Sequence, residues 1–292
     1  MFQRCLICTD FSDGLQRLIH FVPALAAGGF TQIVFVHTVP LWEEGDVPRV
    51  DQERIEAAQA RLQGVVNHAP PGVEVIVEVR SGKAAEMIPK LLEQYHSDLI
   101  LMGTPTRSLV QETVFGSTTQ SLTRNTKSPL LILRPQLVAV YREEELNLRC
   151  QHLWRSLLIP YNGGPSADYL IDRVKGLIAK DPDHSLTQCH LVWVVTGGGR
   201  RTEQDGHQYQ MAEEKLAAVK TDLAAMGVAV ETVVRTGDPL QEIMTVAMEM
   251  DISAIAIAYR SRGALLDWTS PSFANEVLRN SWFPVLFFSP KE

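Results

Sequence analysis

The sequence predicts an α/β protein of two tandem domains, each an open parallel sheet of five strands covered by helices. The first observation is an internal repeat, in which Gly82 recurs as Gly237 and Pro129 recurs as Pro284 at one constant spacing. The second is the alternation of short apolar runs with segments of helical periodicity. The third is that the apolar runs are nearly continuous, which is typical of strands buried on both faces of a parallel sheet.

The two copies cover residues 1–137 and 153–292. Their first strands also match, because CLICTDFSDG resembles SLLIPYNGGP and places Asn162 opposite Asp10. Between the copies, the polar segment 138–152 is interpreted as a linker or a short helix. A chain of 292 residues is long enough for two domains with sizeable cores.

Each element of the first copy follows from its local pattern. The first predicted helix contains Pro23, which favours an interruption or a change of helix geometry at that point. The chain order is strand, helix, strand, helix, strand, helix, strand, helix, strand, which right-handed crossovers turn into a doubly wound sheet. Strands are expected at 5–10, 32–39, 73–80, 98–103 and 129–134, and helices at 13–28, 50–68, 83–95 and 116–126.

Composition excludes several classes of protein. The formal net charge of −7 disfavours nucleic-acid binding, and no apolar run has the length of a membrane span. The first residues, MFQRCLICTDF, lack the layout of a signal peptide, so we expect a cytoplasmic protein. Cys5 and Cys8 form a C-x-x-C pair that fits either a redox or zinc site or reduced cysteines in a core strand. The apolar run around them favours the core.

Ligands of doubly wound sheets bind beyond the carboxyl ends of the strands. There the first strand delivers Thr9 and Asp10, the second delivers Thr38 and Val39, and the fourth delivers Met102, Gly103 and Thr104. Asp10 can accept a hydrogen bond from a ribose hydroxyl or a base amine, and the apolar side chains can flank a flat base. The same residues also suit purely structural roles, since an aspartate before a helix is a good N-cap and glycine allows close packing.

The last helix of the first copy opens with Gly116 and three hydroxyl residues, Ser117, Thr118 and Thr119. Free N–H groups and the helix dipole favour an anion at such a start. The hydroxyl groups can bond phosphate or hold a metal ion, although a hydroxyl residue that opens a helix is also an ordinary N-cap. Together with the strand ends, this helix start favours a nucleotide site in the first copy.

These residues resemble the universal stress protein family, and the whole chain resembles its tandem-domain members. Nucleotide-binding members carry G-x2-G-x9-G-[S/T] after the fourth strand. Here Gly103, Gly116 and Ser117 match the motif, Thr106 stands in place of the second glycine, and neighbouring Arg107 is a candidate phosphate ligand. Asp10 in TDFS matches the family's aspartate after the first strand. Val39 matches the family position that packs on adenine.

The resemblance implies a Rossmann-like fold similar to the adenine-nucleotide alpha hydrolases, with the two domains related by a pseudo-two-fold axis. It also implies that ATP, ADP or AMP binds in the first copy, with or without Mg²⁺. The last strands, LLILRP and VLFFSP, are expected to pair within the chain, and pairing of two chains into a homodimer is a further option. A protein partner is expected, but neither a nucleic acid nor a membrane.

The second copy departs from the motif. It has Ala258, Ser261, Pro271 and Ser272 at the four motif positions and Asn162 in place of the aspartate. We therefore expect this copy to have a structural role or to bind a different ligand.

Three functions remain open. The first is a ligand-sensing module of the stress response, the second is a nucleotide-free, chaperone-like scaffold, and the third is a slow ATPase. Hydrolysis needs a group that orients water and strong charge stabilisation at the γ-phosphate. The loop after the fourth strand offers no lysine and no evident general base, so we expect no enzyme, or at most a slow one.

Overall fold

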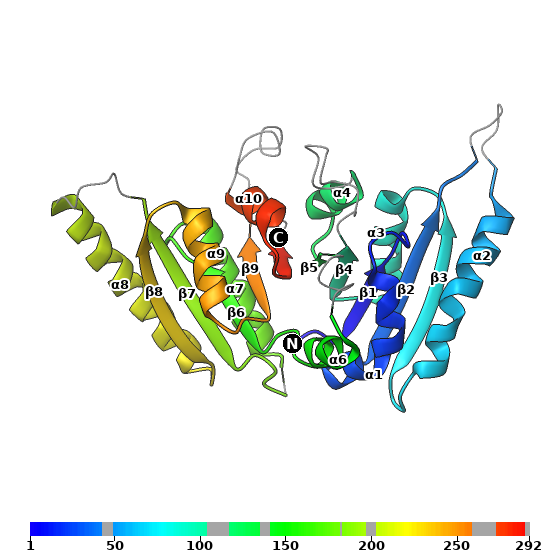
Figure 1. Cartoon of the computed structure of the whole chain (residues 1–292), viewed down its shortest axis with the longest axis horizontal. Helices are drawn as coiled ribbons and strands as arrows, with labels where there is room; N and C mark the ends of the chain where they lie inside the picture. The colour runs from blue at the N-terminus through cyan, green and yellow to red at the C-terminus, as the bar shows by residue number, and fades with distance from the viewer. Residues whose placement is uncertain are drawn as a thin grey trace. The chain divides into compact units, whose positions relative to one another are not determined.

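The structure is a computed structural model, and it describes residues 1–42, 49–103, 117–134, 141–181, 183–196, 203–258 and 273–289. The chain forms two compact units, Phe2–Gln151 and His152–Pro290, called here the N-terminal and C-terminal units. Each unit contains one copy of the repeat (Figure 1).

The N-terminal unit is built on a parallel sheet with strand order β3-β2-β1-β4-β5. The central strand β1 pairs on both sides, Cys5 with Ile33 of β2 and with Leu99 of β4. Central strands are almost wholly buried, as their continuous apolar sequences predict. The strands are β1 (Arg4–Cys8), β2 (Gln32–Val39), β3 (Glu74–Ser81), β4 (Leu99–Gly103) and β5 (Leu130–Leu133).

Two layers of helices cover this sheet, as the contacts among them show: η1, α1 and η2 contact one another, and α3 contacts α4. Pro23 stands in the first turn of α1, where its missing N–H costs no hydrogen bond, and a 3-10 helix precedes it. The predicted helix at 13–28 is thus split in two. The helices are η1 (Leu15–Phe21), α1 (Val22–Ala27), α2 (Gln52–Leu62), η2 (Gln63–His68), α3 (Ala84–Tyr95) and α4 (Ser117–Asn125).

The segment between the two copies contains a helix, α6 (Glu143–Gln151), which packs on α1 within the N-terminal unit. Leu146 and Cys150 are its buried residues. Its three first-turn glutamates are exposed, where the positive end of the helix dipole favours them. Gly28 at the end of α1 permits the contact, because a Cβ there would lie 2.5 Å from the Cys150 carbonyl oxygen.

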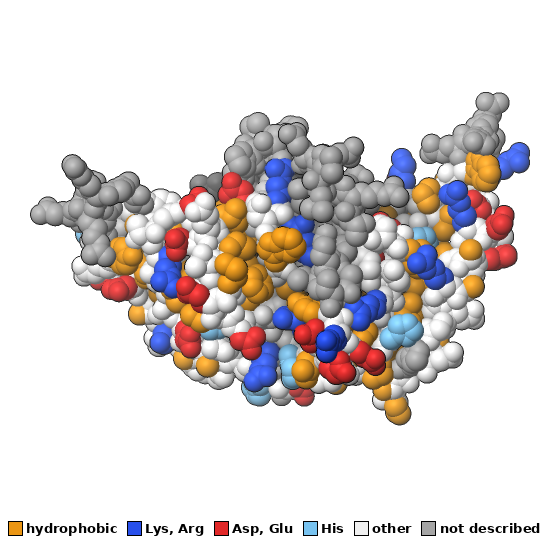
Figure 2. All heavy atoms as spheres, in the orientation of Figure 1, with side chains coloured by type: hydrophobic (Ala, Val, Ile, Leu, Met, Phe, Trp, Pro, Cys, Tyr) orange, Lys and Arg blue, Asp and Glu red, His pale blue; other side chains and the backbone are white. Residues whose placement is uncertain are grey.

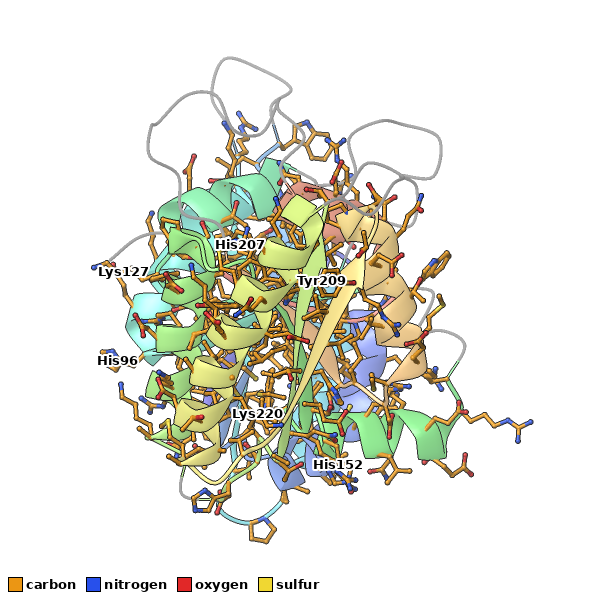
Figure 3. The ribbon with its side chains drawn as sticks, turned by 90° about the vertical axis from the view of Figure 1, so that its left-hand side faces the viewer. His96, Lys127, His152, His207, Tyr209 and Lys220 are labelled. Carbon is orange, nitrogen blue, oxygen red and sulfur yellow. The ribbon has the colours of Figure 1, made fainter. Side chains whose placement is uncertain are left out.

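The C-terminal unit repeats the parallel topology, with strand order β10-β9-β6-β7-β8. Its long helix α8 runs along the sheet, with Tyr209 and Lys220 labelled on it in Figure 3; Tyr209 and Thr236 share a hydrogen bond of 2.7 Å. Its elements are β6 (Ser156–Pro160), α7 (Pro165–Ile178), β7 (Gln188–Val195), α8 (Glu203–Ala224), β8 (Ala229–Thr236), α9 (Pro239–Glu249), β9 (Ala254–Ala258), α10 (Phe273–Asn280) and β10 (Val285–Phe288).

The predicted fold class is confirmed for both units. Pairing of the last strands of the two copies stays a prediction. In the described part of the chain, no helix combines the length and hydrophobicity needed to cross a bilayer. On the face shown in Figure 2, acidic and basic side chains of the described residues are interspersed.

Cys5 and Cys8 lie in β1 as free, buried thiols. Burial raises the pKa of both thiols well above the ordinary value, and the charges of Asp98 and Asp13 add to the shifts at Cys5 and Cys8 respectively. The thiolate form needed for redox or metal chemistry is therefore disfavoured at this C-x-x-C pair. The structure supports the reduced core cysteines among the two alternatives.

Candidate functional site

A cavity of about 140 Å³ opens at the carboxyl edge of the N-terminal sheet. Strands β1, β2 and β4, together with helices α3 and α4, supply its walls. This is the edge where doubly wound sheets bind ligands. The lining residues are Cys8, Thr9, Asp10, Asp13, Val36, Thr38, Ala84, Ile88, Met102, Gly103, Thr118 and Thr119.

A hydrogen-bonded turn follows β1 and forms one side of the cavity. Asp13 is its centre: its Oδ1 accepts from the Thr9 hydroxyl at 2.8 Å and from the Leu15 N–H at 3.0 Å. Asp13 Oδ2 receives the Asp10 N–H at the longer distance of 3.4 Å. Asp10 is exposed, and its Oδ1 accepts from both the N–H and the hydroxyl of Ser12. The turn is therefore organised by its own side chains.

Gly103 at the end of β4 gives Asp13 its place. A Cβ at position 103 would lie 2.4 Å from Asp13 Cβ and 2.9 Å from Asp13 Cγ. Asp13 is only 4% exposed, yet it lines the cavity. Gly103 thus allows the turn after β1 to pack closely against the end of β4. This packing places the buried Asp13 carboxyl group in the cavity lining.

Burial raises the pKa of the Asp13 carboxyl, hydrogen bonds from the Leu15 N–H and the Thr9 hydroxyl oppose the shift, and the charge of Asp10 adds to it. No lysine or arginine of the described ranges forms an ion pair with Asp13. A buried carboxylate without a cationic partner is costly unless its oxygens find hydrogen-bond donors. The turn supplies such donors to Asp13, two at short distance to Oδ1 and one at the longer distance to Oδ2, so Oδ2 is the oxygen that could accept from a further donor.

Phe11, between Asp10 and Ser12, has a φ of 66°, a left-handed conformation that bulky residues rarely adopt. Its ring stacks on His37 with 4.3 Å between ring centres, and the Arg61 guanidinium carbon lies 4.2 Å from the Phe11 ring centre. His37 Nδ1 lies 2.8 Å from the Thr9 carbonyl oxygen, so this nitrogen carries the proton and donates. These contacts hold the strained turn next to the cavity.

The structure brings six of the predicted site residues together in this cavity: Thr9, Asp10, Met102, Gly103, Thr118 and Thr119. Ser117 begins α4. The predictions for Thr106, Arg107 and Gly116 fall outside the described residues. Of the two residues expected at the end of β2, Thr38 lines the cavity, whereas Val39 is buried and does not, because neighbouring residues of a strand face opposite sides.

Sequence reasoning placed Thr38 at this edge without giving it a ligand role, and it missed five lining residues: Cys8, Asp13, Val36, Ala84 and Ile88. Period-two alternation along β2 would have selected Val36 with Thr38, and the one-turn spacing on α3 would have joined Ala84 to Ile88. Asp13 gave no comparable signal. Its position depends on a turn with a left-handed phenylalanine, which local patterns do not predict.

The C-terminal unit keeps the turn but changes its packing. Asn162 Oδ1 accepts from the Gly164 N–H at 3.0 Å, and Gly163 has a φ of 64°, close to that of its counterpart Phe11. A Cβ at Gly163 would lie 2.7 Å from Lys215 Nζ and 3.2 Å from Trp193 Cη2. The side chains of Trp193 and Lys215 thus leave no room for the phenylalanine ring. Ala258 ends β9, and the predictions for Ser261, Pro271 and Ser272 fall outside the described residues.

Comparisons with known proteins agree with this architecture. The model of the universal stress protein family matches residues 1–134 and again 154–289. A universal stress protein from Archaeoglobus fulgidus DSM 4304 superposes with a TM-score of 0.65 at 18% identity, over 99% of this chain and 98% of that chain. A protein of unknown function from Pseudomonas aeruginosa PAO1 gives 0.61 at 13% identity, over 98% and 92%. No curated protein sequence gives a significant match.

At these identities the solved structures show the fold alone. The family model, however, covers nearly the whole chain and matches once in each repeat. The chain therefore belongs to the universal stress protein family and carries two of its domains in tandem.

Proposed function

We propose that the N-terminal unit binds an adenine nucleotide and that the protein is a ligand-sensing module of the stress response in the cytoplasm. The observation that carries the proposal is the cavity, which combines apolar walls, a buried carboxyl group and the start of a helix. Val36, Ile88 and Met102 offer the apolar surface that a flat base needs. The first turn of α4 offers N–H groups and a positive dipole end to phosphate.

The residues present fit such a ligand. The Thr118 and Thr119 hydroxyls would bond phosphate oxygens beside the start of α4, and the acidic turn after β1 suits the hydrogen-bond donors of the base or sugar. ATP, ADP and AMP share these groups. The described ranges contain no group of three His, Cys, Asp or Glu side chains that could hold a metal ion, so we expect phosphate oxygens to supply most ligands of an Mg²⁺ bound with the nucleotide.

We propose binding and not catalysis as the main function. The described lining residues include no lysine or arginine that would neutralise charge developing at a γ-phosphate. We therefore expect at most slow ATP hydrolysis.

Calorimetry with nucleotide-stripped protein tests the proposal, using Mg-ATP, ADP and AMP. We expect one site per chain. Ala84→Phe places a ring in the cavity and should abolish binding, whereas Ala85→Phe makes the same change one residue along α3, at a position that does not line the cavity, and should bind normally. Absence of both heat and thermal shift for the wild type would overturn the proposal and favour a nucleotide-free scaffold.

A further inference from the structure

The acidic turn after β1 leaves one oxygen of Asp13, a residue that lines the cavity, with unused acceptor capacity. Asp13 Oδ1 already accepts two short hydrogen bonds, from the Thr9 hydroxyl and the Leu15 N–H. Oδ2 has only the long contact to the Asp10 N–H in the described part of the chain. A carboxylate oxygen can accept two hydrogen bonds, so Oδ2 retains acceptor capacity in a side chain that is 96% buried.

We propose that Asp13 determines the specificity of the site by accepting, through Oδ2, a hydrogen bond from a donor group of the ligand. This inference rests on the proposed nucleotide function and deepens it. The donor is either the exocyclic amine of the base or a sugar hydroxyl, since both present an N–H or O–H group to a carboxylate.

Asp10, the more obvious aspartate of the sequence, fits this role less well. Its side chain is exposed, and its Oδ1 is occupied by the N–H and hydroxyl of Ser12. A hydrogen bond discriminates between ligands most strongly when it is shielded from water, because an unpaired buried acceptor pays its full desolvation cost. Asp13 meets that condition through its burial against Gly103.

Ligands that lack the donor group should bind more weakly at this position. Inosine monophosphate differs from AMP at the base by presenting a carbonyl oxygen where AMP has an amine, and 2′,3′-dideoxy-AMP lacks both sugar hydroxyls. The Asp13 carboxylate would be repelled by the carbonyl oxygen of inosine, and the dideoxy sugar would leave it without the ligand's hydrogen bond. We expect the wild type to bind one of these analogues at least about tenfold more weakly than AMP, the size of a hydrogen bond to a charged group.

The test uses calorimetry to measure the affinities for AMP and for each analogue, and it compares their ratio among the wild type, Asp13→Asn and Asp98→Asn. Asp98 is a matched control, a partly buried aspartate that caps the start of β1 at the N–H groups of Gln3 and Arg4, away from the cavity. In Asp13→Asn, which has an amide that both donates and accepts, the discrimination should shrink to about twofold. In Asp98→Asn it should stay as in the wild type.

If Asp13→Asn no longer prefers AMP over inosine monophosphate, the base amine is the donor. If it no longer prefers AMP over 2′,3′-dideoxy-AMP, a sugar hydroxyl is the donor. If the wild type binds AMP but neither ratio changes in Asp13→Asn, the inference is overturned and nucleotide binding stands. If the wild type binds no nucleotide, the proposed function fails and the inference falls with it.

A second measurement needs no variant, in case Asp13→Asn does not fold. Protonation turns one oxygen of Asp13 from an acceptor into a donor, so the wild-type preference for AMP over the rejected analogue should narrow as the pH falls. A preference that stays constant from pH 7 to the limit of folding would contradict the role of Asp13.

Discussion

The side chain of Asp13 occupies the space that a β-carbon at Gly103 would fill. The two β-carbons would lie 2.4 Å apart, far inside van der Waals contact. The glycine that matches the first position of the family motif is therefore required by the packing of the polypeptide itself. A glycine beside a nucleotide site is easily interpreted as leaving space for the ligand. Here the space is filled by the side chain of Asp13.

Gly103→Ala should consequently destabilise the N-terminal unit by about 1–3 kcal/mol, the usual cost of overpacking a well-filled interior. Denaturant unfolding measures this change. Gly176→Ala is the matched control, because a Cβ there meets nothing within 4 Å, and it should be neutral or stabilising. Combining Gly103→Ala with Asp13→Gly should recover part of the loss, and strict additivity of the two changes would contradict the contact.

The strained turn at Phe11 leads to a second prediction. Phe11→Ala loses the contacts with His37 and Arg61 and keeps the left-handed φ, whereas Phe11→Gly loses the same contacts and relieves the strain. The glycine variant should therefore be more stable than the alanine variant by about 1 kcal/mol. In the C-terminal unit, Gly163→Ala should destabilise for the converse reason.

Thermal and denaturant unfolding of the three variants provide the measurement. A Phe11→Ala protein that is more stable than Phe11→Gly would show that the turn does not hold its left-handed conformation in solution. The comparison is informative because the usual order in regular structure is the reverse, with glycine the more destabilising residue.

Most of the fold was predictable from the sequence, because strand and helix periods are local properties. The run QIVFVHTV became β2 with the predicted bounds, and Pro23 marks the division of the first helical segment. The cavity was predictable only in part. Its edge follows from topology, but Asp13 enters it through a long-range contact with Gly103, which no local pattern encodes. The topology predicted both Thr38 and Val39 at the end of β2, and only Thr38 lines the cavity, because the two neighbouring residues face opposite sides of the sheet.

The raised pKa of Asp13 predicts a specific pH dependence of stability. Because burial raises this pKa above its ordinary value of 3.8, the folded protein binds the proton more tightly than the unfolded chain does. The stability contributed by Asp13 is then full below 3.8 and is lost as the pH rises through the raised value. The wild type should thus gain stability relative to Asp13→Asn as the pH falls through this window.

Urea unfolding of both proteins from pH 7 to pH 3.5 measures the difference. The pKa of Asp98 is also raised by burial, but this residue is present in both proteins and its contribution cancels. A difference that is independent of pH, or that grows as the pH rises, would show that the pKa of Asp13 is not raised in the folded state.

The contact between Gly28 and the last turn of α6 supports a final prediction about the segment between the copies. Gly28 has an ordinary φ of −77°, so alanine there is acceptable to the backbone, but its Cβ would lie 2.5 Å from the Cys150 carbonyl oxygen. Gly28→Ala should therefore push α6 away from α1, expose Leu146 and lower the free energy of unfolding by about 1–3 kcal/mol.

Limited proteolysis within 141–151 should become faster, because a helix that loses its apolar contacts opens locally. Gly64→Ala, where a Cβ meets no atom within 4 Å, is the control. If both variants resist proteolysis as well as the wild type, α6 does not depend on α1 and the segment is a linker that is helical by itself.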